Sequence, residues 1–139
     1  MMFDVRTVLN PGMSFIIDRM LDESDTAAYY GSRQLGQLIA SPAYVGLMID
    51  AAVKAVDERL PAGLVTVGRT MEFTHDAPTS LGMNLRIKAS LKEIVGDRLF
   101  FDITACDDCG VIGYGKHERA VVNKQELFER ANKRLLHQA

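Results

Sequence analysis

Residues 41–60 read SPAYVGLMIDAAVKAVDERL, and this stretch decides the fold. Ser41 followed by Pro42 predicts a helix start, because a serine side chain accepts hydrogen bonds from the first-turn N–H groups and proline suits the first helical position. Pro61 and Gly63 predict the end of the helix. We therefore expect a long helix with Ser41 as its N-terminal cap.

The predicted helix is apolar nearly all round. Between Ala43 and Val56 only Asp50 and Lys54 are charged, and Tyr44 is the other partly polar side chain. A helix of this kind has to be surrounded by protein. It is too short to span a membrane, which takes about 20 apolar residues, so we predict a helix in the protein core.

Four strand-like runs follow the helix, separated by turn residues. Residues 83–94 (MNLRIKASLKEI) show the cleanest alternation of apolar and polar side chains, which is typical of a half-buried strand. Glycine, aspartate and proline gather between the runs, as they do in turns. The four predicted strands cover residues 64–75, 83–94, 98–106 and 111–123.

Less regular segments flank this block. Residues 14–20 predict a strand, and residues 21–37 predict a short strand followed by a loop or irregular helix. Residues 124–137 predict a charged amphipathic helix with Leu127, Phe128, Ala131 and Leu135 on its inner side. A buried helix followed by a meander of antiparallel strands implies a curved sheet wrapped around that helix. The sequence thus predicts an α+β protein of the hotdog type with an added C-terminal helix, as one domain over residues 1–139.

Composition and charge narrow the possible functions. The chain has 139 residues, 47% of them hydrophobic and 24% charged, and a formal net charge of -2. This balance gives no drive toward nucleic acid or an anionic membrane surface. The N-terminal segment lacks the basic start and apolar stretch of a secretion signal, so we expect a cytoplasmic protein.

The two cysteines predict a turn and no metal site. Cys106 and Cys109 have C-x-x-C spacing, but the sequence has no second pair to complete a zinc site. Asp107 and Asp108 between them, with Gly110 after them, are typical of a hairpin turn. No phosphate-binding or dinucleotide motif is present either, so we expect no metal and no cofactor.

Three stretches of the chain resemble a known family. They are SPAYVGLMIDAAVKAV (41–56), VGRTMEFTHDAPTSLGMNLRIKASL (67–91) and GYGKHERAVVNKQELFER (113–130). They are similar to the corresponding stretches of the fluoroacetyl-CoA thioesterase family, within the hotdog-fold acyl-CoA thioesterases. The resemblance implies hydrolysis of small acyl-CoA thioesters by a homodimer, or by a tetramer built from it, with the site between two subunits.

The resemblance also implies roles for single residues. Ser41 stands at the position of a hydroxyl residue in the family's catalytic set, and His75 matches the histidine of that set. Gly68 matches a glycine that lines the site, and Arg119 matches an arginine near the pocket. The acid that the family carries on the central helix is replaced by Ile49, so the acid-assisted mechanism lacks its acid here.

The chemistry of the individual residues supports a site centred on His75, but each residue also has a structural interpretation. His75 is suited to proton transfer because histidine titrates near neutrality, although it could equally be a satisfied strand-end histidine. Ser41 suits a helix cap or a group that orients water or the thioester carbonyl. The N–H groups of Ala43 and Tyr44 lie at the positive end of the helix, where they can receive an oxyanion.

Asp50 has two interpretations. It forms an ion pair with Lys54, four residues later, or it acts as a general base whose pKa is raised by burial. Adjacent helical residues point about 100° apart, so Asp50 does not simply replace an acid at position 49.

The last predicted strand carries the other charged candidate. Arg119 either binds a phosphate or carboxylate of CoA or pairs with Glu118 or a neighbouring chain. His117 faces the same side of the strand as Arg119 and is expected to be exposed. Gly113 and Gly115 predict a bulge or a close backbone approach.

Two functions of different classes follow. The first is a thioesterase acting on acyl-CoA, or on another thioester such as one carried by an acyl carrier protein. The second is a non-catalytic acyl-CoA-binding hotdog module that has lost its acid at Ile49. A hotdog hydratase is a third class, but it would need an acid and histidine pair on a recognisable loop, which the sequence does not show.

Overall fold

A computed structural model describes residues 3–137, and its main elements follow the predicted order. Each predicted boundary of the five strands and of the C-terminal helix lies within two residues of the observed one. Strand β1 (Ser14–Met20) precedes helix α1 (Ser41–Val56), followed by β2 (Leu64–Phe73), β3 (Asn84–Val95), β4 (Arg98–Asp107), β5 (Gly110–Asn123) and helix α2 (Lys124–Leu136).

The segment between β1 and α1 differs from its prediction. It contains a 3-10 turn at Glu23–Asp25 and isolated bridges instead of the expected short strand. One bridge joins Thr26 to Ile39, which closes the segment into a loop at the start of α1. No periodic apolar pattern supports a strand there, so local turns determine its shape.

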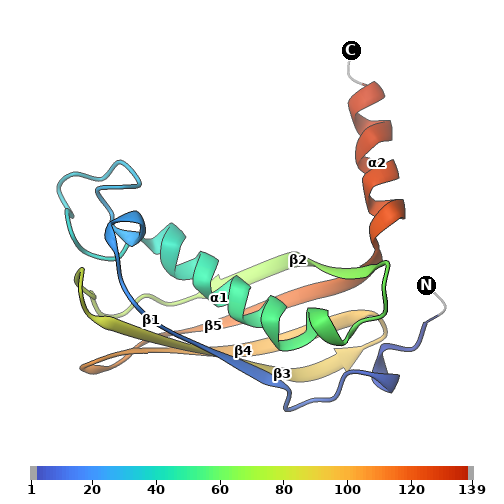
Figure 1. The fold of residues 1–139 in the computed structure, drawn as a ribbon, viewed down its shortest axis with the longest axis horizontal. Helices are drawn as coiled ribbons and strands as arrows, with labels where there is room; N and C mark the ends of the chain where they lie inside the picture. The colour runs from blue at the N-terminus through green and yellow to red at the C-terminus, as the bar shows by residue number, and fades with distance from the viewer. Residues whose placement is uncertain (1–2, 138–139) are drawn as a thin grey trace.

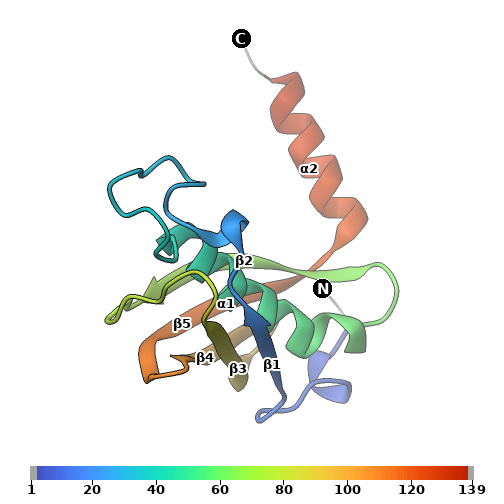
Figure 2. The same ribbon diagram turned by 60° about the vertical axis from the view of Figure 1, so that its left-hand side comes forward.

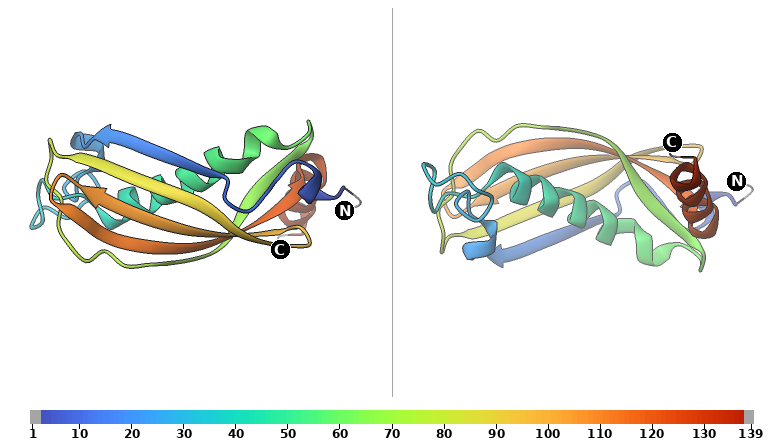
Figure 3. Two further views of the ribbon diagram at one scale, coloured as in Figure 1. Left: turned by 90° about the horizontal axis from the view of Figure 1, so that it is seen from below. Right: turned by 90° about the horizontal axis from the view of Figure 1, so that it is seen from above.

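The five strands form one antiparallel sheet that curls around α1 (Figures 1 and 3). The strand order is β1-β3-β4-β5-β2, so β1 and β2 are the two edge strands. Helix α1 lies on the concave face and packs on β3 and β1. This arrangement confirms the predicted α+β hotdog architecture.

The alternation in β3 and the composition of α1 explain the core. Leu85, Ile87, Ala89 and Leu91 point inward from β3 and are fully buried. Alternate residues of a strand face opposite sides of the sheet, so this pattern gives β3 one apolar face. The buried face of α1 consists of Ala43, Tyr44, Met48, Ala51, Ala52, Ala55 and Val56.

One side of α1 remains uncovered, contrary to the prediction of a helix surrounded on all sides. Val45, Ile49 and Val53 recur every four residues on this side and are only partly buried, and Gly46 beside them is exposed. The sheet curls around the opposite side of the helix (Figure 1). Apolar stripes at a surface are common where proteins contact other molecules.

Helix α2 projects away from the rest of the chain (Figures 1 and 2). Asn123 caps it by accepting a hydrogen bond from Glu126 N at 3.0 Å, and none of its residues is buried. Of the predicted inner side, Leu127 is partly buried, whereas Phe128 and Leu135 are exposed within the described part of the chain. Within residues 3–137 no helix is both long and apolar enough to cross a membrane.

Candidate active site

The chain beyond β2 carries His75 against the first turn of α1. Thr74 extends the pairing with β5 by donating its N–H to the Tyr114 carbonyl at 2.8 Å. The Thr74 carbonyl accepts a hydrogen bond from the Tyr44 hydroxyl at 2.9 Å, which ties the strand to the helix. A Cβ at Gly113 would lie 2.1 Å from the Thr74 oxygen and 2.3 Å from the Tyr44 hydroxyl. Gly113 is thus the predicted close backbone approach, and it leaves room for this tie.

The imidazole of His75 is held on two sides. Its ring stacks on Tyr44 with centroids 4.4 Å apart and planes 21° apart, and its Nδ1 lies 3.1 Å from the Ser41 hydroxyl. In the described residues, His75 Nε2 is the one buried side-chain nitrogen or oxygen with no hydrogen-bond partner. One ring nitrogen is therefore fixed by a hydroxyl, and the other keeps unused hydrogen-bonding capacity.

Burial sets the protonation of both stacked rings. It lowers the pKa of His75, and the nearby Asp76 charge only partly opposes this. It also raises the pKa of Tyr44 to about 12, assisted by Asp76 and Cys106. The imidazole is therefore neutral at physiological pH and can accept a proton, while the phenol stays a hydrogen-bond donor.

Ser41 is the first residue of α1, not its cap, so that prediction is wrong. Ala40 is the N-cap residue, and no side chain caps this helix. The Ser41 hydroxyl contacts His75 instead. The Tyr44 N–H donates to the Ala40 carbonyl at 3.0 Å, so it is not available for an oxyanion. The N–H groups of Ser41 and Ala43 precede this first intrahelical bond and remain available.

A cavity of about 490 Å³ opens beside His75. Its walls come from residues 27–40, from the first turn of α1 and from residues 75–78. The apolar wall residues include Ala27, Leu35, Leu38, Ile39, Ala77 and Pro78. A cavity of this size with a few polar groups at one side is typical of a small-molecule site.

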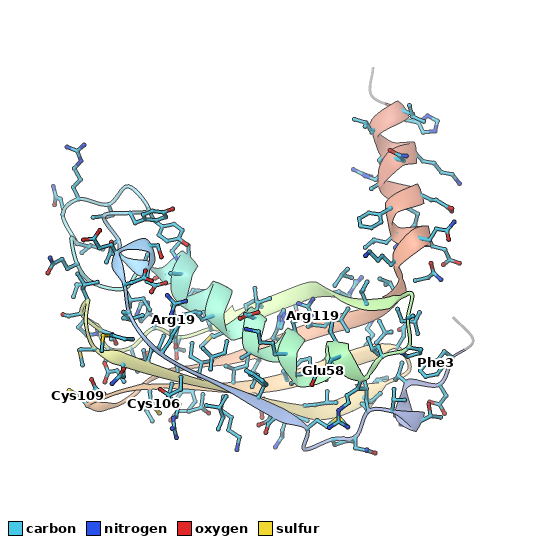
Figure 4. All side chains as sticks on the ribbon, in the orientation of Figure 1. Phe3, Arg19, Glu58, Cys106, Cys109 and Arg119 are labelled. Atoms are coloured by element: carbon cyan, nitrogen blue, oxygen red, sulfur yellow. The ribbon has the colours of Figure 1, made fainter. Side chains whose placement is uncertain are left out.

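Arg119 lies on the same face of the sheet as α1 and is buried (Figure 4). Its Nε donates to the Thr66 hydroxyl at 2.7 Å, and its Nη2 donates to the Thr66 carbonyl at 2.8 Å. The Thr66 hydroxyl in turn donates to Asp57 at 2.5 Å. Glu118 pairs with Arg69 and Arg98, so the Arg119–Glu118 ion pair, one of the alternatives from the sequence, does not form.

His117 is buried beside Arg119, so the prediction that it is exposed is wrong. Its Nδ1 lies 2.8 Å from the Thr70 carbonyl, and its Nε2 lies 3.2 Å from Arg119 Nη1. A carbonyl only accepts and a guanidinium only donates, so Nδ1 carries the proton and Nε2 accepts. Burial lowers the pKa of His117, and the Arg119 charge lowers it further against the Thr70 hydrogen bond. His117 is therefore neutral.

Gly68 lies opposite Arg119 in the pairing of β2 with β5. A Cβ there would lie 3.4 Å from both Arg119 Nη1 and His117 Cε1, so a side chain would press on both groups. Seven residues of extended chain separate Gly68 from His75, about 23 Å at strand spacing. Within one chain, the structure brings Ser41, Tyr44 and His75 together and leaves Gly68 and Arg119 apart from them.

Comparison with known proteins places this geometry in a family. The family model described as fluoroacetyl-CoA-specific thioesterase matches residues 21–125. The chain belongs to the fluoroacetyl-CoA-specific thioesterase family.

Relatives of the family support this placement. The fluoroacetyl-CoA thioesterase of Streptantibioticus cattleyicolor is 34% identical over 91 residues, which are 66% of each chain. A crystal structure of a hot-dog-like protein from Thermanaerovibrio acidaminovorans has a TM-score of 0.88 and 27% identity, covering 95% of this chain and 97% of that one. A threonine-to-serine mutant of the fluoroacetyl-CoA thioesterase, in complex with acetyl-CoA, has a TM-score of 0.85 and 27% identity, covering 91% and 98%.

The catalytic acid that the resemblance to the family implies on α1 has no counterpart at its position in this chain. Ile49 stands where the resemblance implies an acid, and it lies on the uncovered side of α1. Asp50 forms an ion pair with Lys54 at 2.9 Å, one of the two alternatives from the sequence. Nine residues of helix separate Asp50 from Ser41, about 13 Å, so the Asp50 carboxylate does not meet His75 within the chain.

Several contributors to the site were not predicted. Thr66 accepts two hydrogen bonds from Arg119 and donates one to Asp57. The Thr74 carbonyl accepts a hydrogen bond from Tyr44, which fixes the chain just before His75. Each acts through a partner distant in sequence, so no local pattern marks it. Gly113 carried a signal, since a glycine inside a strand indicates a close approach.

The turn prediction for the two cysteines is confirmed. Cys109 and Asp108 lie in the turn between β4 and β5, and both cysteines are free. In residues 3–137 no group of three or more potential metal ligands comes together.

Proposed function

We propose that this protein hydrolyses acyl-CoA thioesters at a His75-centred site completed by a second subunit. The observation that supports this most is the neutral His75 imidazole, bonded to Ser41 at a helix N-terminus and facing an apolar cavity. This arrangement supplies a proton acceptor, a hydroxyl and backbone N–H donors around one space. Thioester hydrolysis needs these three groups.

The proposed reaction uses His75 as the general base. His75 accepts a proton from water as the water oxygen bonds to the thioester carbonyl carbon. The N–H groups of Ser41 and Ala43 stabilise the oxyanion at the positive end of α1. The C–S bond then breaks, and His75 returns the proton to the departing CoA sulfur. Ser41 orients the water or the carbonyl, and the products are the free acid and CoA.

A dimer through β2 would complete the site. The edge of β2 is open from Gly68 to Thr74, with Met71, at its centre, partly buried. Antiparallel pairing of two such edges about Met71 brings the Gly68 end of one subunit, beyond the β-bulge between Gly68 and Thr70, next to the Thr74 end of the partner. The partner's Arg119, which pairs with its Gly68, then approaches His75 and can bind the CoA phosphates or the acyl carbonyl.

The uncovered stripe on α1 supports the same dimer. Val45, Ile49 and Val53 are only partly buried within one chain, and in the proposed dimer they would be covered by the partner's α1. Pairing also removes an exposed sheet edge, which proteins commonly protect. Light scattering distinguishes this dimer from a tetramer of two such dimers.

A panel of acyl-CoAs with a thiol reagent tests the proposed activity. Release of free CoA by the wild type, lost in His75→Ala, is the expected result. Saturable binding without release would instead support the non-catalytic module, which the missing acid at Ile49 favours. Light scattering measures the assembly: a monomer at micromolar concentration would contradict the shared site.

A further inference from the structure

Two exposed apolar segments lie at opposite ends of β2. In the loop before α1, Tyr29, Tyr30 and Leu35 are each at least half exposed. On α2, Phe128 and Leu135 are each 60% exposed. Figure 1 shows the loop at one end of the sheet and α2 at the other, both rising on the side that carries α1. Apolar patches of this kind mark interaction surfaces.

Helix α2 needs a packing partner to be stable. It has 13 residues, and isolated helices of this length are marginal in water. Phe128 and Leu135 lie seven residues apart and therefore on one face, with Ala131 between them. The charged residues of the helix, including Arg130 and Lys133, lie mainly on the other sides. An amphipathic helix with an uncovered apolar face is built to pack on something.

The proposed dimer determines what that partner is. Helix α2 starts beside the first residue of β2, since Leu64 pairs with Asn123 and Lys124 N donates to the Gly63 carbonyl at 2.9 Å. In a pairing centred on Met71, the Leu64 end of β2 points toward the partner's segment that follows Phe73 and contains Pro78. Pro78 lines the cavity beside His75.

The direction of α2 fits this position. Figures 1 and 2 show α2 rising from the sheet on the same side as the 26–39 loop. A two-fold axis through β2 keeps both helices on that side and moves α2 of each subunit to the loop of the other. The helix is about 20 Å long, enough to run along the outside of the loop.

We propose that α2 of each subunit forms the outer wall of the partner's cavity, with Phe128 and Leu135 packed against the partner's Tyr30 and Leu35. This inference rests on the proposed dimer and adds a part of the site that the single chain lacks. It also defines the substrate class. An apolar wall closing a cavity already lined by Ala27, Leu38 and Pro78 selects an uncharged, apolar acyl group.

Disulfide trapping tests the wall directly. In a Cys106→Ser, Cys109→Ser background, Leu35→Cys and Phe128→Cys are combined and mildly oxidised. Within one chain the two positions lie at opposite ends of the ten-residue β2, about 30 Å apart, so an internal disulfide cannot form. A covalent dimer on a non-reducing gel is expected. The matched control, Leu35→Cys with Arg130→Cys, places the thiol on another side of α2 and should remain uncrosslinked.

Substrate selectivity gives the functional readout. Phe128→Ala should raise KM for hexanoyl-CoA roughly 10-fold and change KM for acetyl-CoA less than about twofold, because a small acyl group does not reach the wall. A dimer by light scattering with no crosslink from Leu35→Cys and Phe128→Cys would overturn the α2 wall and leave the proposed function standing. A monomer would overturn both. A crosslinked dimer that releases no CoA would retain the wall and reject the hydrolase.

Discussion

The two ends of β2 carry the two halves of the candidate site, and they are built in opposite ways. At the Arg119 end, a buried chain of hydrogen bonds runs from Asp57 through Thr66 to the guanidinium and on to His117. At the other end, His75 has one partner, Ser41, and a free Nε2. Saturated polar groups hold a position, whereas unsaturated ones are available for chemistry. The comparison therefore predicts that substitutions at the Arg119 end lower stability, besides any loss of the proposed substrate contact of Arg119, and that substitutions at the His75 end lower turnover with little change in stability.

The largest expected effect is on turnover at the open end. His75→Ala should lower kcat/KM for acyl-CoA by about 10² to 10⁴, the usual contribution of a general base. The free energy of unfolding should change by less than about 1 kcal/mol, because little of the hydrogen bonding of the fold depends on this ring. Steady-state kinetics and urea unfolding measure the two quantities. His137→Ala, in the C-terminal tail, is the control and should change neither.

The second effect is on stability at the buried end. Arg119→Ala removes both donors to Thr66 and leaves the His117 Nε2 acceptor without a partner, so it should lower the free energy of unfolding by about 3 kcal/mol. Arg98→Ala is the matched control, because Arg98 forms a half-exposed ion pair with Glu118 and should change stability by less than about 1 kcal/mol. Equal unfolding midpoints for the two variants would remove the contrast between the ends of β2.

The sequence specified the fold more fully than the site, for a physical reason. Residues 83–94 alternate because one face of β3 meets the core, and that local pattern is visible without any partner. The apolar character of α1 predicted its central place. It also led to an overestimate of the burial of α1 within one chain, since the sequence does not distinguish an apolar stripe that meets the core from one that lies at the surface.

The roles of single residues in the candidate site depend on contacts between residues far apart in the sequence, which no local sequence pattern shows. Ser41 looked like a cap because serine before proline is a common helix start, but its hydroxyl contacts His75, 34 residues later. His117 was expected to be exposed by default, yet Thr70 and Arg119 are hydrogen-bond partners of its two ring nitrogens. Sequence identified the residue types, and tertiary pairing determined their roles.

The third expected effect is a pH dependence of stability that comes from His117, which is buried at the Arg119 end. Burial lowers the pKa of His117 below that of a histidine in the unfolded chain, about 6.5. Between these two values the unfolded chain binds more protons, so stability is complete above about pH 6.5 and falls as the pH drops toward the lowered value. The slope for this histidine is at most about 1.4 kcal/mol per pH unit.

Urea unfolding at several pH values between 5 and 8 measures this slope. His117→Gln keeps a polar side chain without titrating in this range, so the wild type should lose more stability than the variant on acidification. The carboxylates contribute equally to both proteins and cancel in the difference. Parallel curves would show that His117 is not held neutral by its burial.

The smallest expected effect concerns Asp50, which lies between the two ends on α1. Its ion pair with Lys54 is about half exposed on both sides, and exposed pairs of this kind contribute little to stability. Asp50→Asn should therefore change the unfolding free energy by less than about 0.5 kcal/mol and leave kcat/KM within about twofold, because within the chain the carboxylate is about 13 Å along the helix from Ser41. Lys54→Gln breaks the same ion pair without removing the carboxylate and serves as the matched variant.

If Asp50→Asn lowered turnover 100-fold while Lys54→Gln did not, the carboxylate would have to act on the His75 of the partner subunit. The acid lost at Ile49 would then have moved one position along the helix, and the open end of β2 would depend on the second chain for its acid as well as for its arginine.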